Sequence, residues 1–198
     1  MLAYLFWHWP RDEVDVETYE RSLAGFHQAL MAAPSDGLRG SATFRVEGAT
    51  WVGSEPHAYE DWYLLDGSFA LDLLNEAAVT GSRQQLHDEA ARAAAGGAGG
   101  LYHLKSGEPE VAGLRFAAWL TKPPNTDYRD FYALLEPWTD RPGRSLWRRQ
   151  MVLGPAPEFC LLGMERLPFP GSLEPVGVER ELVWPPAPPP RARGPAMG

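Results

Sequence analysis

The amino-acid sequence predicts an α+β fold in which one βαββαβ unit is followed by a second, degenerate copy of itself. Two observations lead to this fold class. Short apolar or alternating segments, typical of strands, are separated by segments whose apolar residues recur in steps of three and four, typical of helices. The order of elements then begins again near residue 112: residues 114–119 can be laid on residues 2–7, with a leucine, an aromatic residue and a tryptophan in matching positions.

The first unit opens with a strand and a helix. Residues 2–9 form a short apolar run that ends at Pro10, as expected for a strand buried on both faces. Asp15 is placed to cap a helix that ends before Pro34 and Gly37. One face of this helix is apolar and carries Val16, Tyr19, Leu23, Phe26 and Leu30.

Two further strands follow. Residues 41–46 alternate between polar and apolar side chains, and residues 59–65 are rich in aromatic and aliphatic side chains. Both patterns predict strands, and their order after the first helix continues the βαββαβ sequence of elements.

A second helical region closes the first unit. It begins at Ser68, is interrupted at Gly81 and extends to about residue 95. We expect the glycine-rich run 96–100 to break this helix, as a hinge or a C-cap, and to lead into a fourth strand over 101–105.

The second unit repeats the strands but lacks the second long helix. Its helix opens at 126–128, in the position that 17–19 occupies in the first unit, and residues 168–175 read as a loop. Its predicted strands cover residues 114–119, 146–153, 158–164 and 178–184. The predicted division is therefore a first repeat over 1–106, a second over 112–184, and a disordered tail rich in Pro, Ala and Arg over 185–198.

The alternation of the strands predicts which side chains face away from the helices. An arginine buried beneath a helix would carry a large desolvation penalty, so Arg45 and Arg115 are expected on the other side of the sheet. The same alternation brings Trp7 and Trp119 to that side. The alternative is that these arginines form salt bridges with acidic side chains, namely Glu60, Asp61, Glu179 or Glu181.

Composition excludes several kinds of partner. The chain has 26 acidic and 18 basic residues, a formal net charge of −8, so nucleic acid is not expected to bind. Cys160 is the sole cysteine, which excludes an internal disulfide and a cysteine-based zinc site. The histidines lack metal-ligand spacing, so no metal site is predicted. Without a signal peptide or an apolar run long enough to cross a membrane, the protein is expected to be cytoplasmic, with no membrane contact.

In this split, ferredoxin-like order of elements, the chain resembles the dimeric α/β-barrel superfamily over roughly residues 1–184. That superfamily includes antibiotic-biosynthesis-type monooxygenases, EthD-like proteins, muconolactone isomerase-like enzymes and haem-binding branches. Pro10 followed by Tyr19 to His27 is similar to the EthD-like opening, and Ser82 to His87 resembles the helix end at which monooxygenase-like members place a histidine beside their cavity. The resemblance implies two repeats that stand in for two subunits, hence a monomer as an internal pseudo-dimer, or a homodimer.

The resemblance further implies a small-molecule cavity inside the barrel and a monooxygenase- or isomerase-type enzyme that acts on an aromatic or polyketide-like organic acid without a cofactor. His87 and Tyr63 are the candidates for proton transfer. The side chains expected to hold the substrate are Trp7, Trp62 and Trp119 around its ring and Arg45 and Arg115 on its acid group. Two alternatives stand beside this reading: a non-catalytic binding or interaction module whose barrel is filled by side chains, and a haem-binding member in which His87 ligates the iron.

Overall fold

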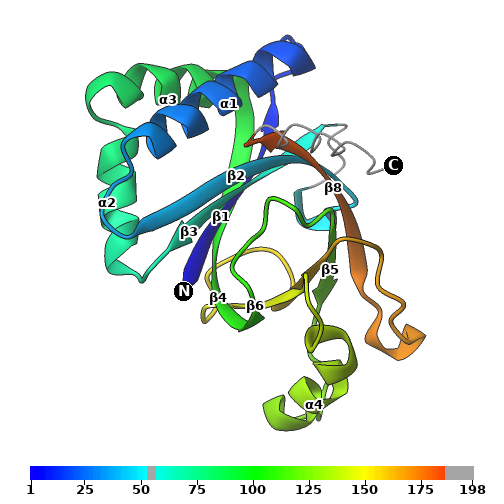
Figure 1. Ribbon diagram of the computed structural model, residues 1–198. Helices are drawn as coiled ribbons and strands as arrows, with labels where there is room; N and C mark the ends of the chain where they lie inside the picture. Colours follow the sequence, from blue (N-terminus) through cyan, green and yellow to red (C-terminus); the bar gives the residue numbers. More distant parts are fainter. Residues whose placement is uncertain (53–56, 186–198) are drawn as a thin grey trace, which may run out of the picture.

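In the computed structural model, which describes residues 1–52 and 57–185, the strands form one closed antiparallel barrel (Figure 1). The strands are β1 (Leu2–Pro10), β2 (Leu38–Glu47), β3 (Ala58–Leu65), β4 (Ala94–Gly107), β5 (Phe116–Leu120), β6 (Ser145–Arg149), β7 (Phe159–Gly163) and β8 (Val176–Trp184). Around the barrel they follow the order β1-β3-β2-β8-β5-β7-β6-β4, and β4 pairs with β1 to close it. The fold is thus α+β, as the sequence predicts.

The helices lie outside the barrel (Figure 1). Three of them, α1 (Val16–Ala32), α2 (Phe69–Ala78) and α3 (Gly81–Ala93), cover the strands of the first half, and α4 (Tyr128–Thr139) lies at the opposite end of the molecule. The expected caps are present, since Asp15 accepts a hydrogen bond from the Thr18 backbone and Asp127 accepts one from the Asp130 backbone, both at 2.8 Å.

The two halves place their strands in the same order. The first half has β4-β1-β3-β2 and the second has β8-β5-β7-β6, and the halves meet at the β2–β8 and β4–β6 pairs. Short 3₁₀ turns lie at Thr50–Val52 and Gly171–Leu173. The latter is the sole helical turn described between β7 and β8, where the first half has α2 and α3.

Large aromatic side chains fill the barrel interior. The indole rings of Trp7, Trp62, Trp119 and Trp147 are fully buried there. The Trp7 and Trp119 rings lie 5.7 Å apart, and those of Trp62 and Trp147 lie 5.3 Å apart, both in edge-to-face contact. These rings occupy the space in which a ligand cavity is expected from the sequence, since an eight-stranded barrel encloses a volume that side chains can fill.

A buried ion pair completes this interior. The Arg180 Nε atom donates to Glu60 Oε1 at 3.1 Å, and both side chains have no exposed surface. The same carboxylate accepts hydrogen bonds from the indole Nε1 atoms of Trp62, at 2.6 Å, and of Trp7, at 2.8 Å. Each charge of this pair thus has a partner of opposite sign, which offsets part of its desolvation cost.

The glycine-rich run 96–100 belongs to a strand, so the expected hinge or C-cap is wrong. Strand β4 begins at Ala94, directly after α3, and includes these glycines. A Cβ atom on Gly97 would lie 2.4 Å from Phe6 Cζ, and one on Gly99 would lie 2.8 Å from Tyr4 Oη. Glycine is required here because aromatic rings of β1 lie across the neighbouring strand.

Two other expectations differ in extent. The predicted strand over 146–153 ends at Arg149 in β6, because Met151 takes a left-handed backbone conformation (φ 56°). The predicted disordered tail lies, from residue 186 onward, outside the described residues.

Candidate functional site

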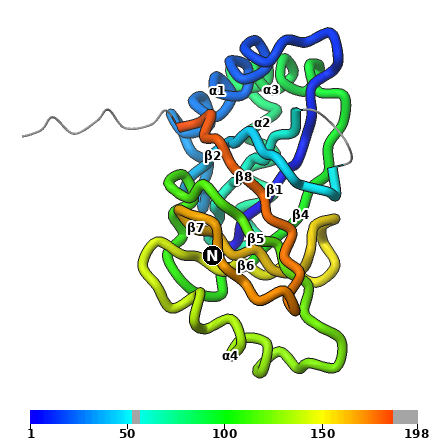
Figure 2. Tube along the Cα trace, turned by 90° about the vertical axis from the view of Figure 1, so that its right-hand side faces the viewer, coloured from blue at the N-terminus to red at the C-terminus, as the bar shows by residue number. Residues whose placement is uncertain are grey.

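A cavity of about 490 Å³ lies between helices α1, α2 and α3 and the outer face of β1 and β3. Figure 2 shows this group of helices at one end of the molecule, away from α4. The cavity is lined mostly by apolar and aromatic side chains, with a few polar groups among them. Its size and lining are typical of a small-molecule site.

Aromatic rings form the sheet side of this cavity. The ring of Tyr4 stacks on Tyr63 at 5.9 Å and on Phe6 at 6.4 Å, and the ring of Phe6 stacks on His8 at 5.4 Å. These side chains share one face of the sheet because they alternate along β1 and pair across β3. The result is a row of nearly parallel rings, a surface that suits a planar ligand.

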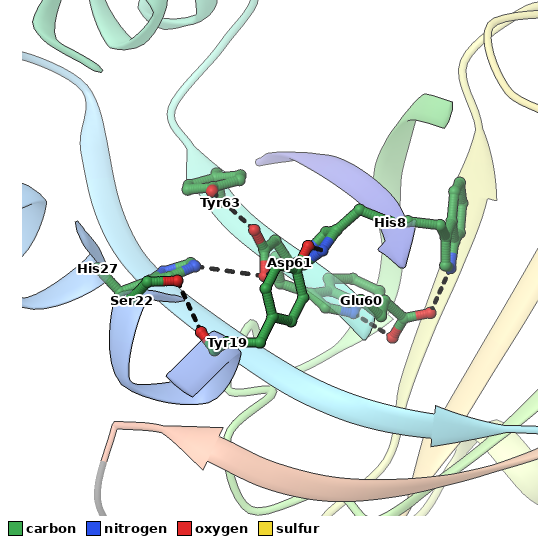
Figure 3. Close-up of polar contacts among 9 residues, drawn as sticks. His8, Tyr19, Ser22, His27, Glu60, Asp61 and Tyr63 are labelled. Carbon is green, nitrogen blue, oxygen red and sulfur yellow. Dashed lines mark hydrogen bonds and ion pairs between the residues drawn. The ribbon is translucent and has the colours of Figure 1, made fainter. Parts of the chain in front are cut away.

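Asp61 lies at the base of the cavity and is 3% exposed. Its Oδ1 atom is 3.3 Å from the Nε2 atoms of both His8 and His27, and its Oδ2 atom accepts a hydrogen bond from the Tyr63 hydroxyl at 3.0 Å. The two imidazole rings approach the carboxylate from different sides (Figure 3). Their contacts with Oδ1 have ion-pair distance but lack the angles of a directed hydrogen bond, so both histidine nitrogens retain unused hydrogen-bonding capacity.

A second hydroxyl extends this group of side chains toward α1. The Oη atom of Tyr19 lies 2.6 Å from His8 Nδ1, and both side chains line the cavity. When the hydrogen of the neutral His8 imidazole is on Nε2, which faces the Asp61 carboxylate, Nδ1 accepts the hydrogen bond from the Tyr19 hydroxyl. Tyr19, His8 and Asp61 therefore form a connected hydroxyl–imidazole–carboxylate series.

The electrostatics of this series keep its members in defined protonation states. Burial opposes the ionisation of Asp61, but its electrostatic contacts with the His8 and His27 imidazoles outweigh this effect and lower the pKa of the Asp61 carboxyl below its ordinary value. Burial and the nearby Asp61 charge raise the pKa of Tyr63 and of Tyr19 well above that of a free tyrosine. At neutral pH the site thus contains one carboxylate and two protonated tyrosine hydroxyls.

Polar groups also stand at the mouth of the cavity. His87 on α3 has a side chain that is 35% exposed; its ring packs edge-on against Phe26 and its Nδ1 atom lies 3.2 Å from Asp88 Oδ1. Asp72 and Asn75 on α2 are exposed and line the same space. Among the residues that the structure describes, no lysine or arginine lines this cavity.

The two residues predicted for proton transfer lie on the same cavity. Tyr63 is at its base and His87 is at its mouth. The predicted ring-binding residues Trp7, Trp62 and Trp119 do not line it, because they point into the barrel from the opposite face of the strands. The structure therefore brings the proton-transfer candidates together but separates them from the tryptophans.

The expected orientation of the two arginines is wrong. Arg45 is half-exposed at the outer side of β2, where its Nη1 atom is 3.1 Å from Glu20 Oε1 and its Nη2 atom is 2.5 Å from Glu181 Oε2. Arg115 is exposed at the surface just before β5. Arg45 escapes the desolvation penalty by pairing with carboxylates near the helix edge, which agrees with the salt-bridge alternative for Glu181.

Sequence reasoning missed His8, Tyr19 and Asp61 as members of one site. The signal was present in the alternation of residues 59–63, which puts Asp61 and Tyr63 on one face and Glu60 on the other. His8 shares the helix-facing side of β1 by the same rule. The contact with Tyr19 depends on how α1 crosses the sheet, which the strand pattern does not specify.

The described residues contain no group of three or more His, Cys, Asp or Glu side chains arranged to hold a metal ion. In the same part of the chain, no helix is long and apolar enough to cross a membrane.

Comparison with known proteins identifies the fold. No family model and no curated protein matches the chain. Among solved structures, a protein described as a "putative monooxygenase" from Lactobacillus acidophilus NCFM matches with a TM-score of 0.50 and 11% identity, over 83% of this chain and 77% of that one. A "putative chlorite dismutase" matches with a TM-score of 0.44 and 12% identity, over 82% of this chain and 78% of that one. At 11% identity the first likeness shows the fold alone.

Proposed function

We propose that the chain is an enzyme that transfers a proton from a planar aromatic or polyketide-like compound bound in the cavity beneath α1, α2 and α3. The proposal depends on one observation: a buried carboxylate, Asp61, lies between two imidazoles and a tyrosine hydroxyl at the base of an otherwise apolar cavity. Buried titratable groups that converge on a cavity in this way are candidates for acid–base catalysis.

The proton would pass through Tyr19 to His8. A substrate C–H or O–H group gives its proton to the Tyr19 oxygen while the Tyr19 proton moves to His8 Nδ1, 2.6 Å away. The resulting imidazolium faces the Asp61 carboxylate, which orients the ring and stabilises its charge. Tyr63, through its hydrogen bond, and His27, through its ion-pair contact, hold the Asp61 carboxylate in position.

The same first step serves two reaction types. In an isomerase-type reaction the proton returns to another carbon atom of the substrate. In a cofactor-independent monooxygenase-type reaction the carbanion formed would react with molecular oxygen and a proton to give a hydroperoxide, which would lose water and leave a carbonyl group; the substrate carbon supplies the electrons. Solvent-exposed His87, at the mouth of the cavity, is placed to exchange a proton with water in either case.

The lining residues do not fit haem. Each haem carries two propionate groups, and the described lining of this cavity offers no lysine or arginine to pair with them, while Asp61 and Asp72 would repel them. We therefore derive no step through haem ligation by His87.

We also propose that the two halves of the barrel are tandem copies of one ferredoxin-like unit that form an internal pseudo-dimer. The identical strand order of the halves supports this. In the second half, α4 packs directly on the sheet, with the ring of Phe131 4.9 Å from that of Phe159. One active site per chain is the expected consequence.

Hydrogen–deuterium exchange tests the proposed function. 2-Tetralone is an uncharged bicyclic ketone with an acidic C–H group, and its exchange in D₂O can be followed by proton NMR with and without the protein. We expect the protein to accelerate exchange, and we expect Tyr19→Phe and His8→Gln to lower that rate by about 10²–10⁴-fold, the usual contribution of a general base.

The matched control is Asp66→Asn, which alters an exposed carboxylate paired with Arg39 outside the cavity. It should leave the exchange rate unchanged. If 2-tetralone binds to the folded protein but exchanges at the uncatalysed rate, the non-catalytic binding module replaces the enzyme proposal.

A further inference from the structure

The side chains around the cavity that can carry a charge near neutral pH are carboxylates and imidazoles. Asp61 is at its base, Asp72 is at its mouth on α2, and His8 and His87 line the space between α3 and β1. Among the residues that the structure describes, none of those that line the cavity is a lysine or an arginine. Arg11 and Arg92, which follow β1 and lie on α3, donate hydrogen bonds to backbone carbonyls and do not line the cavity.

A negative charge brought into this space would be repelled. A carboxylate would lose its hydration in a mostly apolar cavity and would meet no cation that could replace it. It would also lie near the ionised Asp61, and like charges separated by a few ångströms in a partly buried site repel by several kcal/mol.

A positive charge at the mouth would be favoured instead. Asp72 is an exposed carboxylate at the rim, and the aromatic side chains of Tyr4 and Phe6 line the same cavity. Aromatic faces and a carboxylate are the groups that bind an ammonium ion.

From this distribution we propose that the site selects its substrate by charge: it takes planar phenols or enols without an acid group, and it favours those with an amine at the end that reaches Asp72. This inference rests on the proposed function. It replaces the substrate class expected from the sequence, which is an organic acid held by arginines. The hydroxyl of such a compound would reach Tyr19 and Asp61, and its opposite end would lie at the mouth.

A matched series of ligands tests the inference by calorimetry at neutral pH. The probes are 2-naphthol, 6-hydroxy-2-naphthoic acid and 6-(aminomethyl)-2-naphthol, which share a ring system and differ in charge. We expect the acid to bind at least about tenfold more weakly than 2-naphthol. The amine should bind more tightly than 2-naphthol, by about two- to fivefold, as for an exposed ion pair.

Two variants test whether the Asp72 carboxylate causes the tighter binding of the amine. Asp72→Asn should remove the advantage of the amine, so that the amine and 2-naphthol bind about equally well to this variant. Glu76→Gln, which alters an exposed carboxylate on the same helix outside the cavity, should keep that advantage. Tighter or equal binding of the acid would overturn the inference and leave the proposed function standing. Failure of all three probes to bind to the folded protein would overturn both.

Discussion

Glu60 and Asp61 are consecutive residues of β3 whose carboxylates are buried on opposite faces of the same sheet (Figure 3). Glu60 points into the barrel, where Arg180 and two indoles surround it. Asp61 points toward the helices, where two histidines and a tyrosine surround it. The first carboxylate is enclosed by a packed core, and the second borders a cavity, so only the second can meet a ligand.

The Glu60–Arg180 pair is expected to matter for stability and not for ligand binding. Glu60→Gln should lower the free energy of unfolding by about 3–5 kcal/mol, because it leaves the buried Arg180 charge uncompensated. The double variant Glu60→Leu with Arg180→Leu should be less destabilised than the sum of the single changes, with a coupling of about 1–3 kcal/mol. Urea unfolding of the unchanged protein, Glu60→Leu, Arg180→Leu and the double variant measures this coupling; strictly additive effects would contradict it.

The Asp61 carboxylate should make stability depend on pH in the acid range. Its pKa is lowered in the folded protein, so the unfolded chain binds more protons as the pH falls and the stabilisation is lost below the ordinary aspartate pKa of about 3.9. In urea unfolding at a series of pH values, Asp61→Asn should flatten this acid decline. Asp12→Asn, at an exposed position, is the control and should keep it.

We expect the tryptophans inside the barrel to contribute to stability and not to ligand binding. Trp119 is fully buried among other aromatic rings, so Trp119→Ala should lower the free energy of unfolding by about 3–5 kcal/mol. The milder Trp119→Phe should retain the fold and bind 2-naphthol as the unchanged protein does. Loss of binding in folded Trp119→Phe would show that the barrel interior takes part in the site.

Gly99 should control the size of the cavity. A Cβ atom there would lie 2.8 Å from Tyr4 Oη and 2.9 Å from Tyr4 Cε2, so Gly99→Ala should displace the Tyr4 ring at a cost of about 1–3 kcal/mol. Because Tyr4 lines the cavity, 2-naphthol binding measured by calorimetry should weaken. Gly113→Ala is the control, since an added Cβ there meets no atom within 4 Å, and it should leave binding unchanged.

Much of the fold could be predicted from local patterns, whereas the site could be predicted only in part. The resemblance to the superfamily led to Tyr63 and His87 as proton-transfer candidates without the structure, and both line the cavity. Arg45 was placed on the wrong side because its desolvation penalty was assumed to be unavoidable, whereas Glu20 and Glu181 supply compensating charges from α1 and β8. The arginine that lies buried inside the barrel is Arg180. Its charge can be buried there because it pairs with Glu60, which is 120 residues away in the chain.

The sequence by itself determined the order of the elements, the α+β class and the two faces of most strands, because turn residues, caps and periodicity act over a few neighbouring residues. Only the tertiary structure decided which face of the sheet is hollow. That outcome depends on how side chains from distant segments fill space: four tryptophans occupy the barrel, while α1, α2 and α3 stand over β1 and β3 and leave a cavity around Asp61.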